Sequence, residues 1–243
     1  MEKQSVIFRD LEKMEYQTAW DYQEKLLKEN VRKKSEVGVV KSEEDNAEAG
    51  TKHYLLFVEH PPVYTLGKSG NKDNVLLDEN ELKEMNIQFF STNRGGDITF
   101  HGNDQIVGYP ILDLEKFYTD ISRYLRNLEE VIILTLKEYG IKGERSAGET
   151  GVWIDTTISG KERKICAIGV RCSRWITMHG FAFNVNTDLS YFNHIIPCGI
   201  VNKQVTSLEK ELGYKAEMAE VKEKVKCNFE KVFEANLVSE VLL

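Results

Sequence analysis

The sequence YFNHIIPCGI, residues 191–200, places one cysteine, Cys198, between Pro197 and Gly199. Proline holds its own φ angle at about −65° and lacks an N–H group, whereas glycine allows positive φ and close approach of another backbone. Such a frame presents a short nucleophilic side chain at a defined angle with little bulk around it. A turn that merely holds a small hydrophobic residue is the alternative. The pattern makes Cys198 a candidate nucleophile.

A second unusual stretch is TNRGGDITFHG, residues 92–102. Two adjacent glycines let backbone N–H groups approach a ligand closely, and Arg94 adds a rigid fork of donors. The spacing matches neither a phosphate-binding G-x-x-x-x-G-K-[ST] loop nor a dinucleotide-binding G-x-G-x-x-G turn. A hairpin without function would explain the glycines, but it explains Arg94 and His101 less well. We therefore expect a ligand-binding loop.

Lys164 stands at the start of the apolar segment KICAIGV. A lysine in this position is most often a solvated strand end. If it faces the site, its positive charge favours the thiolate form of a nearby cysteine. His179 and His60 are equally compatible with structural positions, and the five histidines lack metal-ligand spacing. Metal catalysis is therefore not favoured.

The composition excludes several classes of protein. The formal charge of −7 argues against broad binding to nucleic acid. The longest dense apolar run, VIILTL, is too short to span a bilayer, and the N-terminus lacks the pattern of a secretory signal. We expect a cytoplasmic protein with four free thiols. Local basic patches could form at residues 142–145 and 161–164 and at Arg123 with Arg126, although solvated loops and an ordinary helix face explain them equally well.

Apolar patterning predicts two long helices before the C-terminal region. One covers residues 13–34, and the other begins at Thr119 or Asp120 and runs to about Tyr139. The polar, acidic residues 35–52 are typical of a mobile insertion.

The remaining pattern predicts an α/β (α+β) fold with a mixed sheet flanked by helices. Strands come in runs without a regular strand–helix alternation, which favours one mixed sheet in a single domain over residues 1–243. Helical patterns from about residues 206 and 217 end the chain. The expected strands are HYLLFVE, VYTLG, IQFFST, DITFHG, QIVGYPILDL, GVWID, KICAIGV and ITMHGFAFNVN.

The ordered segments EHPPVYTLG, RGGDITFHG, QIVGYPILDL, GVWID, KICAIGVR, TMHGFAFNV, IIPCGI and VTSLEKELG resemble the octanoyltransferase family, also called lipoate–protein ligase B. The resemblance covers residues 53–214. It implies the fold of biotin and lipoate ligase catalytic domains and an acyl transfer that needs no cofactor. Octanoyl would pass from acyl carrier protein to an enzyme cysteine, and then to a lysine of a lipoyl domain or of the glycine-cleavage H protein. We also expect a monomer that binds neither nucleic acid nor membrane.

The resemblance assigns roles to residues that match the family motifs. Cys198 is similar to the acyl-thioester nucleophile, and Lys164 to the residue that lowers its pKa. The residues similar to the family's substrate-binding positions are Arg94, Gly95, Gly96, Asp97, Ile98, Thr99, Phe100, His101, Ala167, Ile168, Gly169, Gly180, Phe181 and Ala182. No metal ligand is implied.

One departure from the family pattern follows His101. The family usually continues with Pro-Gly, whereas this chain has Asn103 and Asp104. Both residue types form turns and tolerate left-handed backbone, so we expect the turn to persist. The carboxylate of Asp104 could oppose a thiolate in the site and weaken activity.

Three alternatives remain open from the sequence. An ATP-dependent lipoate or biotin ligase of the same fold would not need Cys198. A non-catalytic binder of acyl carrier protein or lipoyl domains would form no acyl-enzyme. A generic cysteine hydrolase would pair the cysteine with a histidine, and His194 is only four residues away in the sequence.

Overall fold

The computed structural model describes residues 3–36, 50–196 and 204–239. An eight-stranded mixed sheet runs in the order β10-β8-β9-β6-β2-β1-β11, and β7 pairs with β8 beside this path. Its strands are β1 (Gln4–Lys13), β2 (His53–Glu59), β6 (Gln105–Ile111), β7 (Val152–Ile154), β8 (Arg163–Ser173), β9 (Ile176–Asn184), β10 (Gln204–Val205) and β11 (Ala235–Ser239).

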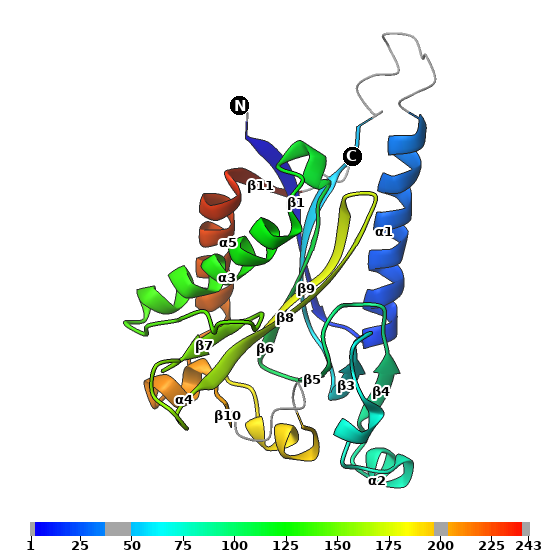
Figure 1. The fold of residues 1–243 in the computed structure, drawn as a ribbon. Helices are drawn as coiled ribbons and strands as arrows, with labels where there is room; N and C mark the ends of the chain where they lie inside the picture. Colours follow the sequence, from blue (N-terminus) through cyan, green and yellow to red (C-terminus); the bar gives the residue numbers. More distant parts are fainter. Residues whose placement is uncertain (1–2, 37–49, 197–203, 240–243) are drawn as a thin grey trace.

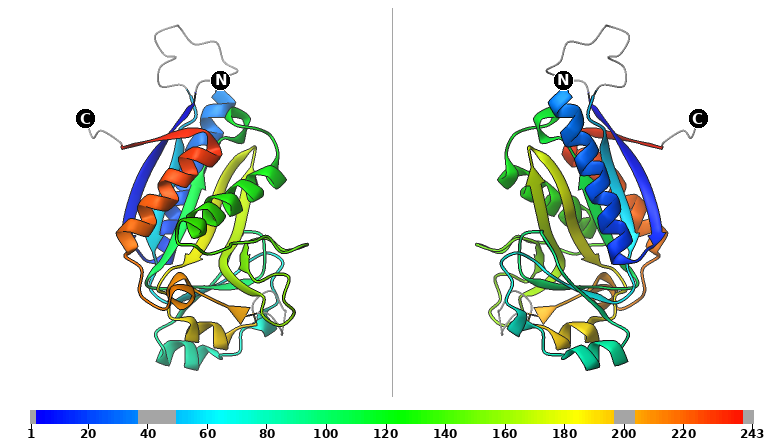
Figure 2. Two further views of the ribbon diagram at one scale, coloured as in Figure 1. Left: turned by 90° about the vertical axis from the view of Figure 1, so that its left-hand side faces the viewer. Right: turned by 90° about the vertical axis from the view of Figure 1, so that its right-hand side faces the viewer.

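Helices cover both faces of this sheet (Figures 1 and 2). Helix α1 (Tyr16–Glu36) lies on one face, and α3 (Ile121–Glu138) with α5 (Met218–Phe233) lies on the other. Strand β2 shows why both faces need cover. Leu55 belongs to the cluster under α3 and α5, whereas Leu56 belongs to the cluster under α1. Because successive strand residues point to opposite faces, the apolar run of β2 is buried on both sides.

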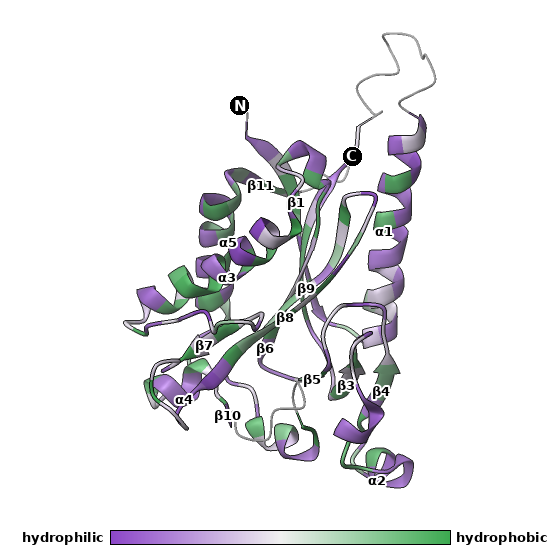
Figure 3. Cartoon of the chain, in the orientation of Figure 1, coloured by the Kyte–Doolittle hydropathy of each residue, from purple (hydrophilic) through white to green (hydrophobic). Residues whose placement is uncertain are grey.

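The two long helices follow from their sequences. Asp120 caps α3, since its side chain accepts from Arg123 N–H, and Gly140 takes a positive φ of 74° after the helix end. Three of the apolar residues expected on one face, Leu128, Ile132 and Leu136, are buried. In α1, buried residues form a narrow stripe, and Figure 3 shows the rest of that helix as mainly hydrophilic.

A second, three-stranded sheet lies at the lower end of the molecule in Figure 1. Its central strand, β3 (Val63–Leu66), pairs with β4 (Gln88–Ser91) and β5 (Ile98–His101). Apolar residues of this sheet form a separate core cluster with Leu82 of α2 (Glu79–Glu84). The remaining elements are the short helix α4 (Leu208–Leu212) and the 3-10 turns η2 (Lys72–Asn74), η3 (Leu114–Lys116) and η4 (Leu189–His194).

The mixed sheet flanked by helices confirms the predicted fold class, but the terminal strands were not predicted. Strand β1 pairs in parallel with both β2 and β11. Val6 is the one fully buried residue in β1, and Ala235 in β11. Strand β11 is the edge strand and β1 is its inner neighbour, and each buries so little that no strong apolar alternation marks it.

Most of the expected insertion 35–52 is not described. Helix α1 continues to Glu36, and residues 37–49 lie outside the described part of the chain. At its other end, the N–H of Lys52 donates to the Asn30 side chain at 2.9 Å. Both ends of the stretch therefore belong to the folded scaffold. Among the described residues, no helix combines the length and apolarity needed to cross a membrane.

Candidate active site

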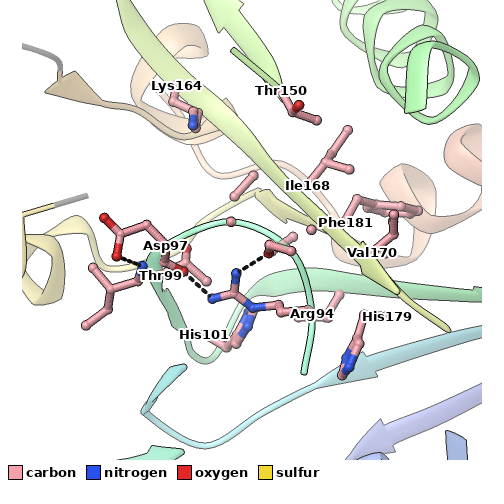
Figure 4. Close-up of a pocket in the computed structure, with 18 of the residues that line it drawn as sticks. Arg94, Asp97, Thr99, His101, Thr150, Lys164, Ile168, Val170, His179 and Phe181 are labelled. Atoms are coloured by element: carbon pink, nitrogen blue, oxygen red, sulfur yellow. Dashed lines mark hydrogen bonds between the residues drawn. The ribbon is translucent and has the colours of Figure 1, made fainter. Parts of the chain in front are cut away.

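A cavity of about 580 Å³ lies where the loop formed by residues 94–97 meets β8 and β9 (Figure 4). Its walls combine the loop, both strands, Leu125 of α3 and residues 148–150. The residues expected at a site that line it are Arg94, Gly95, Gly96, Asp97, Ile98, Thr99, His101, Lys164, Ala167, Ile168, Gly169, Gly180, Phe181 and Ala182. The structure thus brings together expected site residues that lie up to 88 positions apart in the chain, from Arg94 to Ala182.

Small residues on β8 and β9 make room for the loop. Ala167 pairs with Ala182 across the strands, and Gly169 pairs with Gly180. Because residues two apart on a strand share a face, these four form a patch without large side chains. A Cβ atom on Gly169 would lie 2.7 Å from the carbonyl oxygen of Gly95. The loop therefore contacts the strand backbone directly.

The loop continues the hydrogen bonding of β8 at this edge. The N–H of Gly95 donates to the carbonyl of Val170 at 2.9 Å. On the other side, the carbonyl of Arg94 accepts from Lys68 N–H, and that of Gly96 accepts from Ser69 N–H. Gly96 adopts a φ of 87°, which glycine permits at little cost. The backbone N–H of Gly95 is thus committed to the strand and is not aimed at a ligand.

Arg94 is buried, and its side chain stabilises the loop through hydrogen bonds. Its Nη2 donates to the carbonyl of Thr65 at 2.5 Å, to the Thr65 hydroxyl at 2.9 Å and to the carbonyl of Asp97 at 2.8 Å. Only 7% of the residue is exposed. Its other terminal nitrogen, Nη1, donates to the carbonyl of Gly95 at 3.0 Å. The planar fork thus reaches acceptors from two separate nitrogens, which the single nitrogen of an ammonium group cannot do. Arg94 therefore sets the shape of the binding loop.

Lys164 lies where β8 meets two neighbouring strands. Its carbonyl accepts from Thr206 N–H at 2.9 Å, and Trp153 of β7 is its partner on the opposite edge. The ammonium lies 4.5 Å from the centroid of the Trp153 ring, within the range of a cation–π contact. Lys164 is the one lysine among the described residues that lines the cavity. The structure therefore brings a positioned cation to the cavity wall.

The histidines of the cavity are buried and neutral. Burial, with a smaller effect of nearby Arg94, lowers the pKa of His179 to about 3. Burial, followed by His60 and Arg94, lowers the pKa of His101 well below its usual value. His60 does not line the cavity, and its Nε2 pairs with the hydroxyl of Tyr109 at 2.7 Å. The structural alternative for His60 therefore fits its surroundings.

The turn after His101 keeps its shape despite the departure from the family pattern. Asp104 adopts the left-handed conformation, with a φ of 56°. Its N–H donates to the Glu59 carboxylate at 3.1 Å, and its carbonyl accepts from Asn186 N–H. Asp104 is not among the described residues that line the cavity. The expected repulsion of a thiolate therefore finds no support in the cavity lining.

Two of the expected site residues are not among the described residues that line the cavity. Phe100 points away from the cavity, because it alternates with Thr99 and His101 along β5, and it stacks on Tyr191 at 4.5 Å between ring centroids. Cys198 lies outside the described residues, so its role stays a prediction.

Several residues of the cavity wall were not predicted as site residues. Gln105 begins one apolar strand pattern and Asn184 ends another. A polar residue at the end of a buried strand is a signal that could have identified both. The others come together only through tertiary contacts. The full set of wall residues that were not predicted is Tyr16, Ser69, Gln105, Val107, Tyr109, Leu125, Gly148, Glu149, Thr150, Val170, His179, Asn184, Phe192 and Val205.

The described cysteines are poor nucleophiles for this cavity. None of Cys166, Cys172 and Cys227 lines it. Burial raises the pKa of Cys166, which lies fully inside the core, and also that of Cys172. His194, the histidine of the hydrolase alternative, is also absent from the described lining.

In the three candidate basic patches, Arg126, Arg145 and Arg163 are paired with carboxylates. Arg145 and Arg126 both pair with Glu129, which is buried on α3. Arg163 pairs with Glu211 and with Asp155. These guanidinium groups therefore stabilise the scaffold of the cavity, and they do not form a free basic surface for an acidic partner.

Comparison with known proteins identifies the family. The family model for the lipoyl protein ligase A/B catalytic domain matches residues 15–230. The octanoyltransferase of Christiangramia forsetii is 57% identical over 230 residues, which cover 94% of this chain and 96% of the relative. That of Flavobacterium johnsoniae is 54% identical over 231 residues, covering 95% and 97%.

Solved structures share the fold. A bipartite lipoate protein ligase from Thermoplasma acidophilum superposes with a TM-score of 0.67 at 16% identity, covering 100% of this chain and 88% of the other. At this low identity the similarity shows the fold alone, and that fold agrees with the mixed sheet and flanking helices described above. Because the family model matches most of the chain and these two curated octanoyltransferases are more than half identical to it, the chain belongs to the octanoyltransferase family of acyltransferases.

Proposed function

We propose that this enzyme takes an octanoyl group from octanoyl-acyl carrier protein onto Cys198 and passes it to the acceptor lysine of a lipoyl domain or of the glycine-cleavage H protein. This would be the first step of endogenous lipoate synthesis. The observation that carries the proposal is Lys164, a cation held at the wall of a cavity whose other walls include Ile168 and Phe181. The cation would favour the thiolate that attacks the thioester, and the apolar wall residues would bind its alkyl chain.

In the first step, the Cys198 thiolate attacks the carbonyl carbon of the octanoyl thioester. A carbon–sulfur bond to Cys198 forms, the tetrahedral intermediate collapses, and the phosphopantetheine leaves as a thiolate. That thiolate would take the proton of the Lys164 ammonium, which leaves Lys164 neutral. The charge of Lys164 would favour the attacking thiolate, since a nearby cation lowers a thiol pKa. One thioester replaces another, so the step is close to energetically neutral and needs no ATP.

In the second step, the neutral amine of the acceptor lysine attacks the acyl-enzyme carbonyl. An amide bond forms, and the bond from carbon to Cys198 sulfur breaks, which regenerates the thiolate. The amine must lose a proton as it attacks. Lys164, neutral at this stage, would accept that proton as general base. The same residue thus supports the thiolate in one step and removes a proton in the next.

The apolar part of the cavity suits the alkyl chain. Leu125, Ile168, Val170 and Phe181 line it. Burial of each methylene contributes about 0.8 kcal/mol, or roughly a fourfold change in affinity. An apolar wall of this kind can therefore favour octanoyl over shorter chains by binding alone. We also propose that residues 1–243 act as a single catalytic domain and as a monomer.

The test is the intact mass of the protein after incubation with octanoyl-acyl carrier protein, without ATP, beside a Cys198→Ser control. We expect an octanoyl-sized gain that hydroxylamine removes and that the control lacks. A lipoyl domain added afterwards should then gain the same mass. A transfer that requires ATP would support the ligase alternative. Partner binding without acyl-enzyme or acylated acceptor would support the non-catalytic binder.

A further inference from the structure

A continuous set of hydrogen bonds joins the binding loop to the strand that pairs with Lys164. We call it the amide relay. It consists of Arg94, Thr65, His101, Gln105, Asn184 and the carbonyl of Thr206. Gln105 and Asn184 are almost completely buried, at 1% and 4% exposure, and both line the cavity.

The direction of the relay is set at Thr206. Its carbonyl oxygen can only accept, so Asn184 must present its Nδ2, which donates at 3.0 Å. The Oδ1 of Asn184 therefore faces Gln105 and accepts from its Nε2 at 2.8 Å. The same Nε2 donates to the carbonyl of Phe100 at 3.1 Å. Backbone carbonyls thus fix the orientation of both amides.

This orientation determines the state of His101. The Oε1 of Gln105 lies 2.9 Å from Nδ1 of His101, so Nδ1 must carry the proton. Because burial and nearby charges lower the pKa of His101, the ring is neutral and its Nε2 holds a lone pair. The Thr65 hydroxyl, 3.3 Å away, donates to that lone pair. Its oxygen is then free to accept from Arg94.

The far end of the relay reaches Lys164 through β10. Thr206 N–H donates to the carbonyl of Lys164 at 2.9 Å, and Val205 is the strand partner of Lys164. Asn184 holds the carbonyl of the same Thr206 residue. One peptide segment is therefore tied both to the strand that carries Lys164 and to the relay that ends at Arg94.

We infer that Gln105 and Asn184 are positioning residues, which hold the 94–97 loop and Lys164 in one fixed relation and keep His101 as a hydrogen-bond acceptor for Thr65. In this assignment His101 is also a positioning residue and not a general base. The inference rests on the proposed octanoyl transfer, because it concerns the alignment of a bound acyl group with Lys164.

Asn184→Asp cuts the relay at one bond. The carboxylate still accepts from Gln105, but its second oxygen faces the Thr206 carbonyl and cannot donate. Asn186→Asp is a matched control, since the Asn186 side chain makes the same kind of bond to the carbonyl of Ala216, at 2.9 Å, outside the relay and the cavity lining. Both variants lose one amide-to-carbonyl bond. Asn184 is more deeply buried than Asn186, so the unfolding free energy of both variants is measured beside their rates.

We expect Asn184→Asp to lower kcat for octanoyl transfer about tenfold or more, with KM for octanoyl-acyl carrier protein changed less than about threefold, because misalignment affects the reacting geometry more than chain binding. Asn186→Asp should keep kcat within about twofold of the unaltered enzyme. Equal effects of the two variants on kcat would overturn the positioning role of Asn184. Absence of transfer by the unaltered enzyme would instead overturn the proposed function.

A measurement that does not depend on activity tests the other half of the relay. Proton–nitrogen correlation spectra should show His101 as the neutral Nδ1–H tautomer between pH 5.5 and 8, and Gln105→Met should change the tautomer because it removes the acceptor. Thr65→Val should lower kcat as Asn184→Asp does, and it serves if the latter variant fails to fold. A protonated His101, or a Gln105→Met spectrum without change, would contradict the inference.

Discussion

Arg94 donates to both the carbonyl and the hydroxyl oxygen of Thr65, at 2.5 and 2.9 Å. The guanidinium of the binding loop is therefore bound to the protein itself, and it stabilises the loop. Its charge nevertheless stays inside the site, where it helps to keep His101 and His179 neutral. A residue expected to bind substrate thus acts first on the shape and the electrostatics of the cavity.

The first prediction concerns Arg94→Lys. An ammonium group cannot reproduce the guanidinium fork, so we expect octanoyl transfer to fall about tenfold or more and unfolding free energy to fall by about 2 kcal/mol. Arg171→Lys is the control, because Arg171 makes an ion pair with Glu24 outside the cavity lining. Steady-state rates and urea unfolding of both variants measure the effects. Full activity in Arg94→Lys would show that the fork is dispensable.

The second prediction separates the two roles of Lys164. Lys164→Met should prevent acyl-enzyme formation at neutral pH, because the thiolate loses its neighbouring cation. Lys164→Arg keeps a positive charge but cannot act as a base, so it should form the acyl-enzyme and fail to pass octanoyl to the amine. Mass spectrometry of enzyme and acceptor follows both steps. An arginine variant that acylates the lipoyl domain normally would exclude Lys164 as general base.

The third prediction concerns the contact between the loop and β8. In Gly169→Ala the new Cβ would lie 2.7 Å from the Gly95 carbonyl, so the loop must move away from the strand. We expect transfer to fall about tenfold or more. Gly50→Ala is the control, since no atom lies within 4 Å of its added Cβ. Equal rates for the two variants would mean that the loop tolerates displacement.

The fourth prediction concerns acyl chain length. A Cβ on Gly108 would lie 2.1 Å from the Phe181 ring, which must then turn toward the cavity that it lines. Gly108→Ala should therefore favour hexanoyl over octanoyl relative to the unaltered enzyme. Gly102→Ala displaces the Phe100 ring in the same way, at 2.5 Å, but outside the cavity lining, and should not change the preference. Competition between hexanoyl-acyl carrier protein and octanoyl-acyl carrier protein measures the ratio of the two transfer rates in each variant.

The fifth prediction is that the free energy of unfolding decreases from pH 7 to pH 5. Burial lowers the pKa of His53 and of His60 to about 4, and that of His179 to about 3. In the unfolded chain these histidines titrate near 6.5, so the unfolded state binds more protons within this window and is favoured as pH falls. Each contributes up to roughly 1 kcal/mol per pH unit.

Urea unfolding across this pH range measures the slope, and His60→Gln isolates one histidine. The variant removes one titrating group, so its slope should be shallower by about one proton. An unchanged slope would show that His60 titrates normally in the folded protein.

The strand and helix patterns were readable where the chain buries a continuous apolar face. Strands β2 and β9, which are buried along their whole length, and the capped helix α3 belong to this group. A mainly apolar run and a helical apolar stripe both predict burial inside the fold. Strand β1 was missed, since all but one of its residues are half-buried or exposed and its pairing partners are distant in the chain.

The sequence by itself determined the chemistry-bearing residue types and the order of the motifs that resemble the family. It could not determine that Phe100 leaves the cavity, that Arg94 braces Thr65, or that Gln105 and Asn184 join the loop to β10. Those relations depend on strand register and on hydrogen bonds between residues up to 79 positions apart. Local propensity contains no information about such partners, so only the tertiary structure decided how the cavity is built.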